Sequence, residues 1–176
     1  MKQYTISVFS QASENFKMQI IAHENILFSE LHQGIQTALE YDSLQMASFF
    51  MSNNDWTKEE EIALIDMEDK GEVLLMNDYK ISDLILAKGQ NLIYLFDFFS
   101  ERSFLMTVDK IEESQDSIFS IDVTGEIPPQ INIDNENIED LMLDDDTEAL
   151  DKEFDDEYND IVGDESFENI DDLEDY

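Results

Sequence analysis

Hydrophobic and polar positions alternate along the first part of the chain. In "QYTISVF" and in "FKMQIIA" every second residue is apolar, and the polar stretch "SQASEN" separates the two segments. A period of two is typical of strands with one buried face, so the pattern predicts a β-hairpin. The spacing then changes to that of one helix face: Phe28, Leu31, Ile35, Ala38 and Leu39. We therefore expect a helix of about three turns after the hairpin.

The middle of the chain predicts further strands and a second helix. "ASFFMS" and "EIALI" are typical of short strands, and "ISDLILA" of a helical segment followed by Gly89 in the left-handed conformation. "NLIYLFDF" and "SFLMTVDKI" give the strongest strand patterns, and "IFSIDV" adds another strand. Because short links join these strands, we expect an α+β fold, with a mostly antiparallel sheet and the helices packed on one of its faces.

The regular pattern ends at "GEIPPQ", where two prolines hold the backbone extended and remove two hydrogen-bond donors. Beyond this point the composition shifts to Asp, Glu and Asn with isolated large apolar residues. We therefore predict an α+β domain over residues 1–133 and an acidic tail over residues 134–176.

The acidic tail contains apolar residues at helical spacing. The positions on this stripe are Leu143, Thr147, Leu150, Phe154, Tyr158 and Ile161, and a smaller cluster begins at Phe167. The surrounding carboxylates oppose helix formation, since each like-charged pair at i,i+4 costs roughly 0.2–0.5 kcal/mol. We expect the tail to become ordered only when this stripe is covered.

Two interpretations of the tail remain open. In the first it is a solvated acidic segment with incidental aromatic residues. In the second it is a binding segment that docks on a partner or on its own domain. The candidate partner-binding residues are Leu150, Phe154, Tyr158, Ile161 and Phe167.

The net charge narrows the choice of partner. The formal charge is -35: residues 1–133 hold 23 acidic and 8 basic side chains, and residues 134–176 hold 21 and 1. Such a field repels nucleic acid backbones and anionic membranes, which are bound through clustered Lys and Arg. A basic protein partner is therefore favoured, beside the simpler roles of solubility and diffuse cation binding.

Motifs for enzymatic chemistry are not found. The chain has no cysteine and no glycine-rich phosphate loop, and its two histidines, His23 and His32, do not have the spacing of a helical metal pair. The stretch from Asp134 lacks the glycine of a calcium-binding loop. We expect no catalytic residue, no metal ligand and no cofactor. The many carboxylates leave a metal-dependent hydrolase and a DNA mimic as alternatives.

Other features favour a soluble, cytoplasmic protein. The opening "MKQYTISVFS" lacks the continuous apolar region of a signal peptide, and no apolar run is long enough for a membrane span. Arg102, the sole arginine, lies between two predicted strands, where we expect an ion pair with Glu101 or Asp97.

Three segments taken together resemble the plasmid pRiA4b ORF-3-like family, also called TnpR-like transposon-passenger proteins. They are "LFSELHQGIQTALEY", "MASFF" and "LIYLFDFFSERSFLMTVDKI", within residues 26–111. Family members show Leu-His and a following Ile on a helix, a segment ending in Phe, and a strand of the form Tyr-x-Tyr-Asp-Phe-Gly-Asp. The matching residues are Leu31, His32, Ile35, Phe49, Tyr94, Asp97 and Phe98.

The chain also departs from the family pattern. Phe96 replaces the second Tyr, Phe99 and Ser100 stand where Gly-Asp is usual, and Arg102 and Phe104 lie near the usual Trp and His. The resemblance implies an α+β domain and assigns no biochemical role. It does not extend to the acidic tail.

Overall fold

The computed structural model describes residues 1–42, 44–66 and 73–130. These residues form one eight-stranded sheet with the strand order β5-β4-β3-β6-β7-β1-β2-β8. The strands are β1 (Lys2–Ser10), β2 (Lys17–His23), β3 (Ser48–Ser52), β4 (Lys58–Ala63), β5 (Leu74–Leu75), β6 (Asn91–Asp97), β7 (Arg102–Glu113) and β8 (Phe119–Thr124), and the helices are α1 (Phe28–Leu39) and α2 (Ile81–Leu84).

The sheet is largely antiparallel, as the sequence predicts. The predicted hairpin is β1 and β2, which pair from Gln3 with His23 to Phe9 with Lys17. The two strongest strand patterns form β6 and β7, which pair with each other, and β8 pairs with β2. The sheet is nevertheless mixed, because β4 and β5 pair in parallel. The short strand β5 was not predicted from the sequence.

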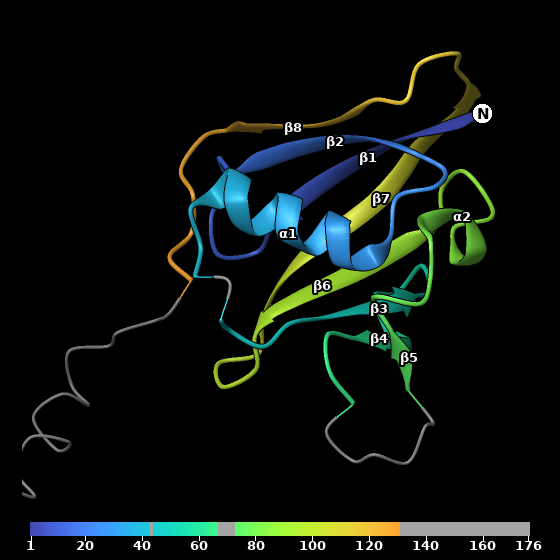
Figure 1. Cartoon of the computed structure of the whole chain (residues 1–176). Helices are drawn as coiled ribbons and strands as arrows, with labels where there is room; N and C mark the ends of the chain where they lie inside the picture. Colours follow the sequence, from blue (N-terminus) through green and yellow to red (C-terminus); the bar gives the residue numbers. More distant parts are fainter. Residues whose placement is uncertain (43, 67–72, 131–176) are drawn as a thin grey trace, which may run out of the picture. The chain divides into compact units, whose positions relative to one another are not determined.

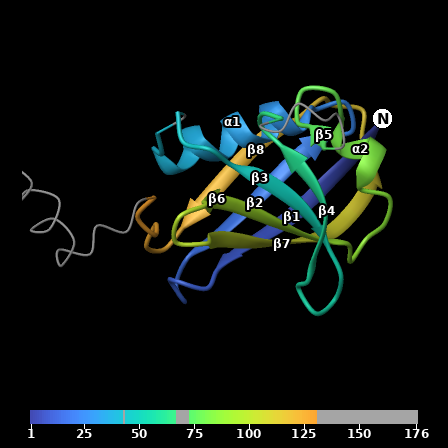
Figure 2. The same cartoon turned by 90° about the horizontal axis from the view of Figure 1, so that it is seen from below.

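The core lies on the face of the sheet that meets α1. Every second residue of the central strands is fully buried there, including Ile6, Ile20, Phe49, Tyr94 and Met106. Figures 1 and 2 show α1 lying along one side of the sheet. The helix contributes Phe28, Leu31 and Ile35 to this core, each with no exposed surface. Burial of this alternating apolar face provides the main driving force for the fold.

Two predicted elements have different bounds in the structure. The second helix was expected over "ISDLILA" but ends at Leu84. The Gln90 side chain explains the early end, because its Oε1 accepts hydrogen bonds from the backbone N–H groups of Leu86 and Ala87 and its Nε2 donates to the Leu84 carbonyl. The strand expected over "EIALI" begins earlier, at Lys58, because Ser52 of β3 pairs with that residue.

No helix in the part of the chain that the structure describes is both long enough and apolar enough to cross a membrane.

Candidate functional site

A series of hydrogen-bonded polar side chains, all buried except Gln130, connects α1 to the last residue that the structure describes, Gln130. Gln130 Nε2 donates to Gln36 Oε1 at 3.3 Å, and Gln36 Nε2 donates to the Tyr94 hydroxyl at 2.6 Å. The Tyr94 hydroxyl lies 2.8 Å from His32 Nδ1. The arrangement that satisfies all three groups has the hydroxyl accept from Gln36 and donate its own proton to His32 Nδ1, with the ring proton of His32 on Nε2.

The pKa values of His32 and Tyr94 are shifted in the directions that keep both side chains neutral. Burial lowers the pKa of His32 and so favours the neutral ring that accepts from Tyr94. Burial also raises the pKa of Tyr94, although the hydrogen bond from Gln36 opposes the rise. His32, Gln36 and Tyr94 are at most 5% exposed, so a substrate in solution would not reach them. Their arrangement is suited to holding structure together.

Arg102, the first residue of β7, also contacts the last described residues and the end of β6. Its Nη2 lies 3.0 Å from Asp97 Oδ2, and the two side chains are only 16% and 11% exposed. Its guanidinium also donates to the carbonyls of Pro129 and Gln130 and stacks over the Phe96 ring, with 5.5 Å between Cζ and the ring centre. The expected ion pair is therefore made with Asp97.

Asp97 is held ionised by its neighbours. Its partial burial would raise the pKa, but hydrogen bonds from Ser100 and Arg102 and the positive charge of Arg102 outweigh that effect and lower the pKa below its ordinary value. Asp97 Oδ1 also accepts from the backbone N–H groups of Phe99 and Ser100, which shapes the turn between β6 and β7. The carboxylate thus orients Arg102 and fixes this turn.

Two further contacts hold the segment of residues 127–130, called the exit segment below because the acidic tail follows it in the sequence. The Tyr41 hydroxyl donates to the Pro128 carbonyl, and burial raises the pKa of Tyr41 to about 12, although the charge of Arg102 opposes the rise. Gln130 forms a reciprocal pair with the backbone of Asp42, at 2.6 and 2.9 Å. We call His32, Gln36, Tyr41, Tyr94, Asp97, Arg102 and Gln130 the anchor network.

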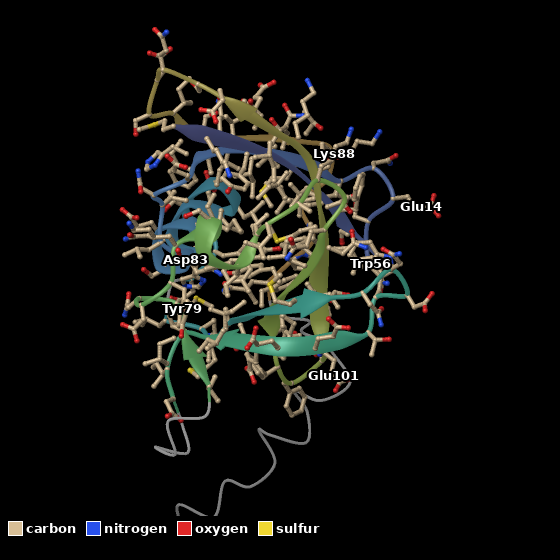
Figure 3. The ribbon with its side chains drawn as sticks, turned by 90° about the vertical axis from the view of Figure 1, so that its right-hand side faces the viewer. Glu14, Trp56, Tyr79, Asp83, Lys88 and Glu101 are labelled. Carbon is tan, nitrogen blue, oxygen red and sulfur yellow. The ribbon has the colours of Figure 1, made fainter. Side chains whose placement is uncertain are left out.

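Exposed apolar side chains surround the end of this network. Ile65 is 55% exposed, Phe98 45% and Phe99 96%; they line two adjoining hollows, and we call these three residues the apolar cluster. Two hollows of about 220 and 260 Å³ share Phe98 in their lining, and Gln130 lines the first of them. Figure 3 labels Glu101 in the turn that carries Phe98 and Phe99. The exit segment therefore ends beside an exposed apolar surface.

The comparisons with known proteins now identify the family. Residues 8–169 match the sequence pattern of the plasmid pRiA4b ORF-3-like proteins. The chain belongs to the plasmid pRiA4b ORF-3-like family. No curated protein matches the chain. The match to this family extends well into the acidic tail, which corrects the expectation that the resemblance stops before it.

A solved structure shows the same fold. It is the crystal structure of a protein of unknown function, MM3350, from Methanosarcina mazei Go1, with a TM-score of 0.57 and 18% sequence identity. The alignment covers 85% of this chain and 86% of that chain. At this level of identity the likeness shows a shared fold alone.

The residues that carried the resemblance to the pRiA4b ORF-3-like family fall into two groups. Leu31, His32, Ile35, Phe49 and Tyr94 meet in the core, where the rings of Phe49 and Tyr94 lie 4.6 Å apart. Asp97 and Phe98 lie at the end of β6, in the anchor network and the apolar cluster. The candidate partner-binding residues, Leu150, Phe154, Tyr158, Ile161 and Phe167, lie outside the described residues.

Gln36, Tyr41 and Gln130 were not identified from the sequence. Gln36 carried a usable signal, because it is a polar residue four positions after His32 on the buried side of α1. Within residues 1–42, 44–66 and 73–130, no three His, Asp or Glu side chains lie close enough together to hold a metal ion.

We expect Tyr94→Phe to lower the free energy of unfolding by about 2 kcal/mol. The change removes one hydroxyl but leaves both His32 Nδ1 and Gln36 Nε2 without their partner in the core, and each unsatisfied buried group costs about 1–3 kcal/mol. Urea unfolding measures the change. Tyr79→Phe is the control, since the half-buried Tyr79 makes no side-chain hydrogen bond to a described residue. Equal costs for the two variants would contradict the role assigned to Tyr94.

The lowered pKa of His32 predicts a specific pH dependence. The folded state resists protonation of this ring while the unfolded state does not, so the stabilisation by His32 is complete well above the ordinary pKa of 6.5 and is lost as the pH falls below it. His32→Asn offers an amide near the position of Nδ1 and does not titrate. We expect the stability advantage of the wild type over His32→Asn to shrink between about pH 8 and about pH 5. A constant difference would contradict a buried neutral His32.

Proposed function

We propose that this protein is a non-enzymatic interaction module in which the sheet domain holds an acidic binding segment, residues 134–176. The segment binds a basic partner protein through Leu150, Phe154, Tyr158, Ile161 and Phe167. The observation that carries this proposal is the anchor network, which fixes the exit segment directly before the acidic residues begin. Several hydrogen bonds to backbone carbonyls hold these four residues against the sheet domain.

The charge distribution supports a basic partner. The tail carries 21 acidic side chains and 1 basic one, and the domain before it is also acidic. A positively charged protein is attracted over a distance of about one Debye length, roughly 8 Å at physiological salt. Burial of the apolar stripe of the tail then provides short-range affinity. The carboxylates of the tail repel one another, and a basic partner would relieve this repulsion.

The apolar cluster supplies a second contact surface on the domain. Phe98 lines both hollows, Gln130 of the exit segment lines the first, and the acidic residues Glu61 and Asp66 line the second. An exposed group of apolar side chains bordered by acidic ones suits a partner whose apolar residues are flanked by Lys or Arg. The tail and the cluster would then both bind the basic partner.

The proposal is tested by separating the apolar contribution of the tail from its charge. The variant Leu150→Ser/Phe154→Ser/Tyr158→Ser keeps every carboxylate. Tagged full-length protein is used to capture binding proteins at low salt, and the captured proteins are quantified and identified. We expect basic proteins to be captured by the wild type and lost roughly tenfold or more from the triple variant, because burial of large apolar side chains contributes about 1.5–3 kcal/mol each.

Met142→Ser/Val162→Ser is the matched control, since both residues are apolar but lie off the helical stripe of the tail. The control should capture the same proteins as the wild type. Undiminished capture by the triple variant would show that the apolar stripe has no part in binding and would refute the proposal.

A further inference from the structure

The two edges of the sheet are protected to different degrees. At one edge β5 is only two residues long, whereas at the other edge β8 extends over six residues, Phe119–Thr124. Among the described residues β8 pairs only with β2, in a register without shifts. It contains no lysine and no proline, which are the residues that commonly block unwanted pairing at an edge. Its outward N–H and C=O groups are therefore suited to accept another strand.

A groove accompanies this open edge. It has a volume of about 550 Å³ and lies between α1 and β8; Gly34, Thr37 and Ala38 of the helix and Phe119, Ser120 and Ile121 of the strand are among its lining residues. Figure 1 shows α1 and β8 running beside each other. A Cβ atom at Gly34 would lie only 2.4 Å from the Phe119 ring, so the glycine allows helix and strand to come close. An exposed strand edge and an apolar groove thus occur together.

We propose that β8 and this groove bind an extended peptide segment of a basic partner protein. The peptide would add to β8 as a further strand, with its backbone paired to the outward groups of β8. Because side chains alternate along a strand, every second residue would enter the groove against Phe119, Ile121 and the small residues of α1. The residues between them would face the solvent. This surface belongs to the domain and does not depend on the acidic tail.

The charges along this edge define the peptide. Asp116 precedes β8, Asp122 lies within it, Glu126 follows it, and Glu30 of α1 lines the groove. No lysine or arginine occurs in residues 111–130. Like charges on neighbouring strands are destabilising, whereas opposite charges contribute roughly 0.2–1 kcal/mol a pair. The edge therefore favours a peptide that carries Lys or Arg at its solvent-facing positions.

The same charges disfavour two other occupants. A second copy paired through its own β8 would place Asp122 and its acidic neighbours against an identical set. The acidic tail, with 21 acidic side chains, would meet the same repulsion. A basic peptide is the occupant favoured both by backbone pairing with β8 and by attraction to the acidic residues along this edge.

The test uses the full-length protein and an acetylated hexapeptide of alternating lysine and valine as the probe. Backbone amides are followed by hydrogen exchange in NMR spectra at physiological salt. Alternate amides of a strand point in opposite directions, so half of the β8 amides face away from β2. We expect the peptide to slow exchange at these outward amides roughly tenfold or more. The same peptide with proline in place of valine has fewer backbone N–H donors and is a poor partner for strand pairing, so it should not slow them.

A variant that fills the groove completes the test. Thr37→Trp, at an exposed position on α1, should weaken peptide binding roughly tenfold, whereas Thr57→Trp, also at an exposed position but before β4, should not. Peptide binding that leaves the β8 amides unchanged and is insensitive to Thr37→Trp would overturn the inference and leave the proposed role of the tail intact. Protection of the outward amides without peptide would also overturn the inference. If that protection did not depend on protein concentration, the acidic tail would be the occupant. If it increased with protein concentration, the occupant would be a second copy of the chain.

Discussion

Gly125→Ala should lower the free energy of unfolding by about 3 kcal/mol or more. Gly125 follows β8 with φ of +85°, a conformation that costs other residues about 1–2 kcal/mol. In addition, a Cβ atom at this position would lie 1.9 Å from the Asn15 carbonyl oxygen and 2.6 Å from the carbonyl carbon. Both are backbone atoms of the loop between β1 and β2, so relief of the clash requires movement of the main chain.

The protein contains a matched control for this change. Gly89 has nearly the same φ, +83°, but no atom lies within 4 Å of the position that its Cβ would take. Gly89→Ala should therefore cost only the conformational term, about 1–2 kcal/mol. Unfolding by urea measures both variants. Equal costs would mean that the close approach of Gly125 to Asn15 contributes nothing to stability.

The second large effect is expected for Arg102→Met. Methionine keeps much of the apolar stem, so packing against Phe96 is partly retained, but the guanidinium is lost. Asp97, only 11% exposed, then loses its charged partner, and the carbonyls of Pro129 and Gln130 lose their donors. Removal of one member of a buried ion pair costs about 3–5 kcal/mol, and this pair is partly exposed, so we expect a loss of about 2–4 kcal/mol.

Two control variants separate charge from geometry. Arg102→Lys keeps the charge but lacks the planar fork that reaches Asp97 and two carbonyls together, so its cost should be intermediate. Lys88→Met removes a positive charge at an exposed position at the other end of β6, as Figure 3 shows relative to Glu101, and should change stability by less than about 0.5 kcal/mol. Arg102→Met without effect would contradict the anchor network as a stabilising feature.

Periodicity was sufficient to predict the elements with one buried and one exposed face. The hairpin of β1 and β2, the helix α1 and the strand β7 each show an apolar spacing that their burial reproduces. The strand β6 is buried on both faces and was predicted from its nearly continuous apolar run. β5 has only two residues and therefore no period to detect. The end of α2 depends on a side chain six residues further along, Gln90, whose hydrogen bonds replace those of the next helical turn.

The candidate site was only partly predictable for a related reason. The family resemblance identified His32, Tyr94 and Asp97, and the shortage of positive charge suggested an ion pair for Arg102. That these residues hold the exit segment could not be predicted, because Gln130 is far from Gln36 in the sequence and comes close to it only in the folded protein. Long-range polar contacts of this kind leave no local pattern. The roles of Leu150, Phe154, Tyr158, Ile161 and Phe167 remain predictions.

The central claim is that the anchor network fixes the exit segment, residues 127–130, on the sheet domain. Backbone ¹⁵N relaxation of Glu126, Ile127 and Gln130, the residues of this stretch that carry an amide proton, tests the claim most directly when the full-length protein is compared with Arg102→Met. We expect these residues to be as rigid as β8 in the wild type and markedly more mobile in the variant, while β8 itself stays rigid in both. An exit segment that is already mobile in the wild type, or equally rigid in both proteins, would contradict the claim.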